Sequence, residues 1–183
     1  MFIAQMMPRS ISAEAYRSIR TSIQYSSIDK KIKTLVVTSS LASEGKSTIS
    51  GNLAYVLSEN NNKVLLIDCD LRKPSLHKKF KVSNEKGITD LLVNKCTINE
   101  VIKVMSKGVH LITAGTIPPN PAEIVGSKAL KDFIDNMEED YDYIVIDTPP
   151  VLAVTDAQLL AAKCDGTVLV SRAKKSRTKY VKL

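Results

Sequence analysis

The sequence predicts an α/β domain in which a doubly wound, mostly parallel sheet is flanked by helices. Segments of strand character alternate with segments of helical periodicity along the chain. The strand segments are unbroken apolar runs, which is typical of parallel strands covered on both faces. In such a domain, ligands bind beyond the carboxyl ends of the strands.

Composition narrows the class of protein. The chain has 183 residues, 44% of them hydrophobic and 25% charged, which suits one soluble domain. It has no apolar run long enough to predict a membrane span. Its three cysteines (Cys69, Cys96 and Cys164) are isolated, which disfavours a disulfide framework or zinc site and fits the reducing cytosol.

The net charge is +7, and much of the excess lies in the C-terminal stretch "SRAKKSRTKYVKL". A basic tail can meet acidic lipid, nucleic acid or an acidic protein, or it can be a solvated helix face. Tyrosines are few and do not alternate with the basic residues as stacking platforms. We therefore expect no nucleic-acid partner.

Apolar periodicity and turn-forming residues predict the helices and strands of the first half of the chain. Residues 1–11 are expected to form a linker, and the domain to begin at residue 12, with Ser12 as N-cap of a helix. "TLVVTS" predicts the first strand, and a helix is expected from Lys46. An asparagine-rich turn separates that helix from "KVLLID", the second strand.

In the second half, residues 87–93 and 98–105 are expected as short helices and "VHLITAG" as the third strand. A proline-marked loop at 117–123 leads to a helix at 129–140. "YDYIVID" and "GTVLVSR" predict the last two strands, with a helix at 156–164 between them.

The stretch "TSSLASEGKST" follows the first strand and opens a helix, which is the context of a phosphate-binding loop (P-loop). Ser40 stands where the pattern has its first glycine; the residue is small, so phosphate binding is compatible unless that position needs a positive φ. Lys46 would reach the β- and γ-phosphates, and Ser47 would offer a hydroxyl to Mg²⁺. The predicted ATP-binding residues are Ser43, Glu44, Gly45, Lys46, Ser47 and Thr48.

Carboxylates end two of the apolar strands. Asp68 and Asp70 lie at the end of the second strand. Asp147 ends the fourth strand, which is the position of a Walker B aspartate. Strand ends of a parallel sheet meet at its ligand-bearing edge. We therefore predict that these three aspartates and Ser47 serve Mg²⁺ and supply a base.

Together, "SSLASEGKST", "DCDLR" and "IDTPP" resemble the motifs of the bacterial protein-tyrosine kinases of capsular and exopolysaccharide synthesis and export. "EAYRSIR" and "IPPNPAEI" are similar to two further segments of that family. The resemblance runs from about residue 12 to residue 171, with the motifs in the family's order.

The resemblance implies a P-loop NTPase fold and an ATP- and Mg²⁺-dependent autokinase. In it, Asp68 would be the base for a tyrosine hydroxyl, Lys46 would act on phosphate, and Asp70 and Asp147 would serve Mg²⁺. It also implies ring-type self-association through Glu14, Arg17 and Arg20. Partners would include a membrane adaptor (a polysaccharide co-polymerase protein) and tyrosine-containing substrates, with the kinase held peripherally at the inner face of the cell membrane.

The chain departs from the family pattern at Ala42-Ser43, where the family usually carries Pro-Gly, and beyond the fifth strand. Family members continue with a helix, a strand and a tyrosine-rich tail, so we expect the domain (12–183) to lack its C-terminal part, including part of the adenine pocket. Tyr180 is the one tyrosine near the end.

Two other functions are consistent with the motifs. One is an inactive kinase-like module that joins rings of full-length partners. The other is a partition- or cell-division-type ATPase, which would carry an extra lysine where this chain has Leu41.

Overall fold

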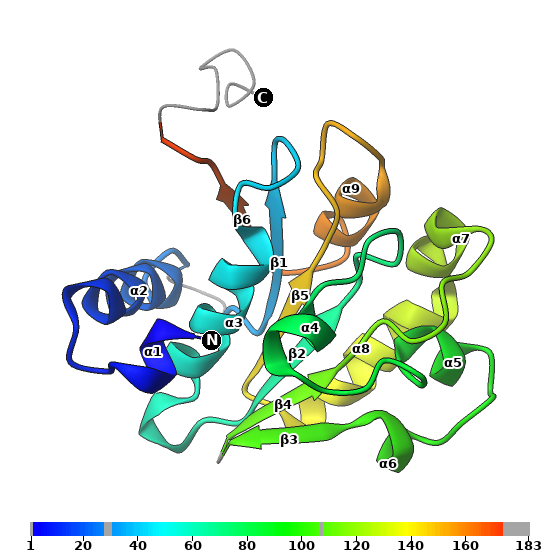
Figure 1. Cartoon of the computed structure of the whole chain (residues 1–183), viewed down its shortest axis with the longest axis horizontal. Coiled ribbons are helices and arrows are strands. Elements are labelled where there is room, and N and C mark those ends of the chain that lie inside the picture. The colour runs from blue at the N-terminus through cyan, green and yellow to red at the C-terminus, as the bar shows by residue number, and fades with distance from the viewer. Residues whose placement is uncertain (1, 28–30, 107, 174–183) are drawn as a thin grey trace.

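A computed structural model describes residues 2–27, 31–106 and 108–173 (Figure 1). Six strands form one sheet in the order β3-β4-β2-β5-β1-β6. Their bounds are β1 Thr34–Ser39, β2 Val64–Asp68, β3 Lys103–Ser106, β4 Val109–Ile112, β5 Tyr143–Asp147 and β6 Gly166–Val170. All neighbouring strands pair in parallel except β3, which runs antiparallel to β4 at one edge. The predicted mostly parallel sheet is confirmed.

Helices cover both faces of the sheet (Figure 1). The helices with their bounds are α1 Ile3–Met6, α2 Ile11–Gln24, α3 Lys46–Leu57, α4 Leu76–Phe80, α5 Ile88–Leu92, α6 Ile98–Val101, α7 Pro121–Gly126, α8 Lys128–Asp140 and α9 Asp156–Ala161, with a 3₁₀ turn at Glu59–Asn61. One apolar cluster joins the sheet to α1–α4, and the other joins it to α5–α9. Burial of both faces explains why the strands are unbroken apolar runs.

The antiparallel strand β3 corrects the prediction of one helix over residues 98–105. Ile98, Val101, Ile102 and Met105 recur at helical spacing. In the structure the helix ends at Val101, and Lys103–Ser106 pairs with β4 instead. Hydrogen bonding to an open sheet edge therefore overrides a local periodicity of only two turns.

The first residues pack against the domain. Phe2 is 3% exposed, and its ring contacts those of Phe80 and Tyr55, with centroids 4.4 and 5.8 Å away. Gly51 of α3 makes room for it, because a Cβ there would lie 2.0 Å from the Phe2 ring. The segment expected as a linker thus carries a short helix and part of the core.

The N-cap of α2 also differs from the prediction. Ser10, not Ser12, precedes the helix, and its Oγ accepts a hydrogen bond from the Ala13 amide at 3.2 Å. Among the described residues, no helix has the length and apolar character needed to cross a bilayer. The basic tail from residue 174 onward, Tyr180 included, lies outside the described residues.

Candidate nucleotide site

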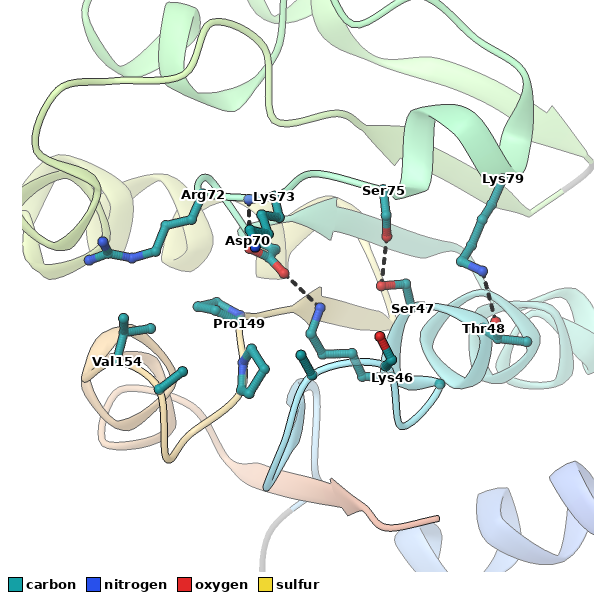
Figure 2. Close-up of a pocket in the computed structure, with 15 residues that line it drawn as sticks. Lys46, Ser47, Thr48, Asp70, Arg72, Lys73, Ser75, Lys79, Pro149 and Val154 are labelled. Carbon is teal, nitrogen blue, oxygen red and sulfur yellow. Dashed lines mark hydrogen bonds and ion pairs between the residues drawn. The ribbon is translucent and has the colours of Figure 1, made fainter. Parts of the chain in front are cut away.

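A cavity of about 510 Å³ opens at the carboxyl ends of the central strands. Three segments line it: the loop between β1 and α3, the chain after β2, and the chain after β5 (Figure 2). Of the six residues predicted to bind ATP, five line the cavity. The exception is Glu44, whose Oε2 accepts a hydrogen bond from the Leu41 amide at 2.9 Å and so holds the loop together.

The backbone of the loop answers the question raised by Ser40. Ser40 is fully buried, and it is absent from the positions with positive φ. The left-handed positions are Ser43, at φ 65°, and Gly45, at φ 102°. Replacement of glycine at position 40 is therefore free of backbone strain, whereas Ser43 carries a conformation that a side chain disfavours.

Lys46 begins α3 and projects into the cavity (Figure 2). Its Nζ lies 2.7 Å from Asp70 Oδ2. Burial alone would lower the pKa of Lys46, but the charges of Asp147 and Asp70 outweigh it and raise that pKa. The ammonium is therefore fully charged at neutral pH and available to an anion that competes with Asp70.

Asp68 and Asp147 end neighbouring strands in direct register, β2 beside β5. Burial, reinforced by the charge of Asp147, raises the pKa of Asp68. Asp68 Oδ2 accepts hydrogen bonds from the amides of Ser75 (3.1 Å) and Leu76 (2.9 Å). This aspartate thus fixes the start of α4 as well as facing its acidic neighbour.

Asp147 is the carboxylate best suited to a metal ion. It is fully buried, Ser50 donates a hydrogen bond to its Oδ1 at 3.0 Å, and its Oδ2 is buried without a partner. Burial raises the pKa of Asp147, and Lys46 and Ser47 lie close enough to oppose that rise. A hydroxyl and one carboxylate fit Mg²⁺, which usually takes one or two protein ligands and completes its shell with phosphate and water.

The charge of Asp70 acts on both Asp68 and Asp147, so the three predicted aspartates lie near one another, but they do not form a ready-made metal site. Within the described ranges, no group of three acidic, histidine or cysteine side chains has an arrangement that could hold a metal ion. Asp70 is engaged by Lys46 and by the amide of Lys73, at 3.0 Å. The side chains of Asp68 and Asp70 therefore organise the loop that follows β2.

Sequence reasoning missed the contribution of that loop. Ser75 shares a hydrogen bond of 2.8 Å with Ser47, and Lys79 Nζ lies 2.9 Å from Thr48 Oγ1. Arg72 also lines the cavity and pairs with the buried Asp156 at 2.9 Å. Arg72 belongs to the quoted "DCDLR" motif, although the sequence assigned it no role. Ser75 and Lys79 gave no signal because α4, at five residues, is too short to show a periodic pattern.

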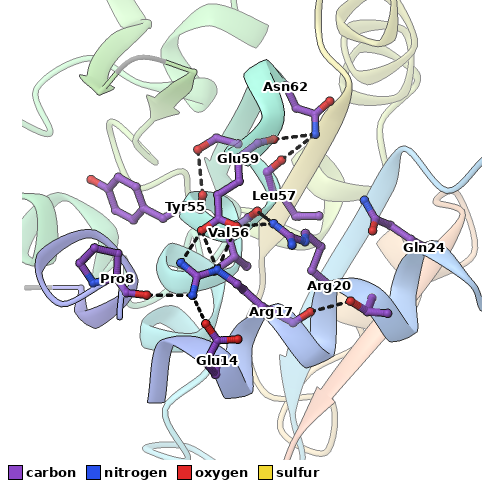
Figure 3. Close-up of polar contacts among 12 residues, drawn as sticks. Pro8, Glu14, Arg17, Arg20, Gln24, Tyr55, Val56, Leu57, Glu59 and Asn62 are labelled. Carbon is purple, nitrogen blue, oxygen red and sulfur yellow. Dashed lines mark hydrogen bonds and ion pairs between the residues drawn. The ribbon is translucent and has the colours of Figure 1, made fainter. Parts of the chain in front are cut away.

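Glu14, Arg17 and Arg20, predicted as an oligomer interface, lie on α2 (Figure 3). Both arginines bind Glu59 of the same chain: Arg17 Nη2 at 2.8 Å and Arg20 Nη1 at 2.5 Å. Arg17 also pairs with Glu14, whose side chain is 64% exposed. The arginines thus join α2 to the end of α3 within one subunit, and Glu14 remains at the surface.

A protein family described as an AAA domain matches residues 32–178 of the chain. Tyrosine-protein kinase YwqD of Bacillus subtilis is 44% identical over 169 residues, which is 92% of this chain and 71% of YwqD. Tyrosine-protein kinase etk of Escherichia coli is 35% identical over the whole chain, which spans only 25% of that longer protein.

Solved structures agree with this likeness. The kinase domain of the Escherichia coli tyrosine kinase ETK superposes with a TM-score of 0.93 at 35% identity, over 99% of this chain and 71% of that one. A plasmid partition protein from Borrelia burgdorferi bound to AMPPNP gives a TM-score of 0.64 at 30% identity, over 83% and 68% of the two chains. The fold is therefore that of P-loop ATPases, and the match is closer to the kinase domain than to the partition protein.

Proposed function

The chain belongs to the family of bacterial tyrosine-protein kinases, and on that premise we propose that it binds Mg-ATP and transfers the γ-phosphoryl group to tyrosine hydroxyls. The observation that carries the proposal is Lys46. Its ammonium stands in a cavity formed by the loop after β1 and is held by a carboxylate that a phosphate can replace.

The residue roles follow from position and chemistry. The amides of the loop and of the first turn of α3 cradle the phosphates, and Gly45 supplies the left-handed turn between them. Lys46 binds the β- and γ-phosphates. Ser47 and Asp147 would hold Mg²⁺, which supplies charge neutralisation on the transferred phosphoryl group.

Asp68 is the proposed base for the tyrosine hydroxyl. Burial raises its pKa from an ordinary aspartate value, which brings its proton affinity closer to that useful in general-base catalysis near neutral pH. Its two hydrogen bonds to the start of α4 leave it oriented rather than mobile. Asp70, predicted from sequence to serve Mg²⁺, is proposed to hold Lys46 until nucleotide binds.

The biological setting is proposed from the family. The kinase would regulate capsular or exopolysaccharide synthesis and export at the inner face of the membrane, through a membrane adaptor, and would assemble with copies of itself. The comparisons favour this function over a partition-type ATPase. The exposed Glu14 on α2 is the residue of the predicted interface that is best placed to meet a neighbour.

Assembly is tested by replacing Glu14 with glutamine and measuring mass by light scattering. A ring contact through this residue predicts a shift toward monomer, whereas an unchanged mass distribution would contradict it. Replacing both Arg17 and Arg20 with alanine should also shift the mass, but it removes contacts inside the subunit as well. Glu14→Gln therefore gives the cleaner result.

The activity is tested by incubating the chain with Mg-ATP and a tyrosine-containing peptide, followed by mass spectrometry. The proposal predicts phosphopeptide with the parent and none with Lys46→Met. Equal phosphorylation by both proteins would refute it. Self-phosphorylation of this chain is proposed at Tyr180 and not at its other tyrosines, and modification of several tyrosines would contradict that part.

A further inference from the structure

Lys79 brings a second cation to the phosphate-binding loop. It lies on α4, a helix that the sequence did not reveal, and its side chain lines the same cavity as Lys46 (Figure 2). Its Nζ donates a hydrogen bond to Thr48 Oγ1, in the first turn of α3, at 2.9 Å. The ammonium on α4 thus reaches the first turn of α3.

Lys79 differs from the other cations that line the cavity. Lys46 is paired with Asp70, and Arg72 with Asp156. Lys79 has no carboxylate partner among the residues that the structure describes; its hydrogen bond is to a neutral hydroxyl. Lysine has three donors, so the ammonium keeps spare donors for an anion. Lys73 also lines the cavity, but its residue is exposed.

The helix that carries Lys79 is anchored to the site. Leu76 is fully buried in the core, and its amide binds Asp68 Oδ2 at 2.9 Å. Ser75 shares a hydrogen bond with the hydroxyl of Ser47. A lysine on an anchored helix loses little freedom when it binds, so its contribution to affinity is larger than that of a surface lysine.

We propose that Lys79 is a second phosphate-binding residue, which contacts the α- and β-phosphates of a nucleotide held by residues 43–48. The first turn of a P-loop helix cradles these two phosphates, whereas the loop lysine reaches the β- and γ-phosphates. Thr48, the partner of Lys79, lies in that first turn. This inference rests on the proposed function, because it needs a nucleotide in the cavity.

The test is calorimetric titration of the whole chain with Mg-ADP and Mg-ATP. Lys79→Gln removes the charge and keeps a polar side chain, and Lys79→Arg keeps the charge. Lys78→Gln is the matched control, since Lys78 is an exposed neighbour on α4 that does not line the cavity. Thermal unfolding of each variant shows that the fold is retained.

We expect Lys79→Gln to raise Kd by about tenfold or more for both nucleotides, which is the usual effect of losing one charge-assisted hydrogen bond. Lys78→Gln should stay within about twofold of the parent, as an exposed and screened charge does, and Lys79→Arg should recover most of the loss.

A Kd for Lys79→Gln equal to that of Lys78→Gln would overturn the inference, as would a loss confined to ATP. If Lys46→Met loses nucleotide while Lys79→Gln does not, the proposed function stands and this inference fails. If neither variant loses nucleotide, both fail.

Discussion

Lys46 Nζ and Asp70 Oδ2 lie 2.7 Å apart, although the sequence predicts that Lys46 binds phosphate and that Asp70 serves Mg²⁺. The pair is largely buried, with side-chain exposures of 12% and 6%. A phosphate that enters the cavity must therefore replace Asp70 as the partner of Lys46. The charge of Asp147, together with this contact with Asp70, keeps the Lys46 ammonium charged in a partly desolvated site.

Replacing Asp70 with asparagine tests this competition. Without magnesium, Asp70→Asn should bind ATP more tightly than the parent, because the buried Lys46–Asp70 ion pair no longer opposes binding; we expect a gain of about fivefold or more, which corresponds to about 1 kcal/mol or more. Calorimetry in the presence of a chelator measures the change. Asp135→Asn, which removes an exposed charge paired with Lys131, is the control. Weaker magnesium-free binding by Asp70→Asn would show that the contact does not hold Lys46 back.

The left-handed backbone at Ser43 predicts an unusual order of stabilities. At φ 65°, glycine should be more stable than alanine by about 1 kcal/mol, because the alanine Cβ is disfavoured there. Urea unfolding of Ser43→Gly and Ser43→Ala measures the difference. At Ser40, which is absent from the positive-φ positions, the matching pair should show alanine at least as stable as glycine. The same order at both positions would contradict the strain at Ser43.

Glu59 gives a prediction about pH. Its hydrogen bond to Arg17, helped by Arg20, holds the pKa of Glu59 below its ordinary value of 4.5. A lowered folded-state pKa stabilises the fold above pH 4.5, and this contribution is lost as pH falls through the folded-state pKa. Glu59→Gln should therefore be less stable than the parent at pH 7. The gap in unfolding free energy should narrow steadily below pH 4.5.

Chemical unfolding of both proteins between pH 3 and pH 7 measures that gap. Glu85→Gln serves as the control, since this glutamate is exposed and has no ion pair among the described residues. If the difference in unfolding free energy between the parent and Glu59→Gln is constant over the whole pH range, the ion pairs of Glu59 with Arg17 and Arg20 do not stabilise the packing of α2.

Phe2 predicts that the first residues stabilise the domain. Phe2→Ala removes a nearly buried ring from its contacts with Phe80 and Tyr55, and we expect a loss of about 3 kcal/mol. Urea unfolding measures it. Ile11→Ala, at a site that is 91% exposed, should change stability by less than about 0.5 kcal/mol. Equal, small effects at both positions would show that the segment is a tether only.

Much of the site was predictable because it lies where strands end. Asp68 and Asp147 close apolar runs, and Lys46 follows a third, so a parallel sheet brings them to one edge whatever the loop details. The contributions of Lys79 and Ser75 were not predictable. They come from a five-residue helix whose position is set by the Asp68 carboxylate and by burial of Leu76, which are contacts between distant parts of the chain.

The edge and the surface of the domain were also beyond local pattern. Residues 98–105 have a helical spacing of apolar residues, and the part that forms β3 becomes a strand because β4 offers unpaired backbone groups. Arg17 and Arg20 have the spacing of an exposed helix face. The spacing does not show whether their partner lies in a neighbouring subunit or, as in the structure, is Glu59, about forty residues further along the same chain. The sequence pattern therefore predicts which helix face such side chains occupy, but not which residue they bind.

The most direct test of the nucleotide site is calorimetric titration of Mg-ATP into the parent chain and Lys46→Met. Lys46 projects into the cavity, but Met leaves the buried Asp70 without its partner, so thermal unfolding of both proteins must show that the variant is folded at the titration temperature. We expect the parent to bind and the variant to lose about 100-fold or more in affinity, because a charged phosphate contact is removed from a partly buried site. Equal affinity of two equally folded proteins would contradict this expectation.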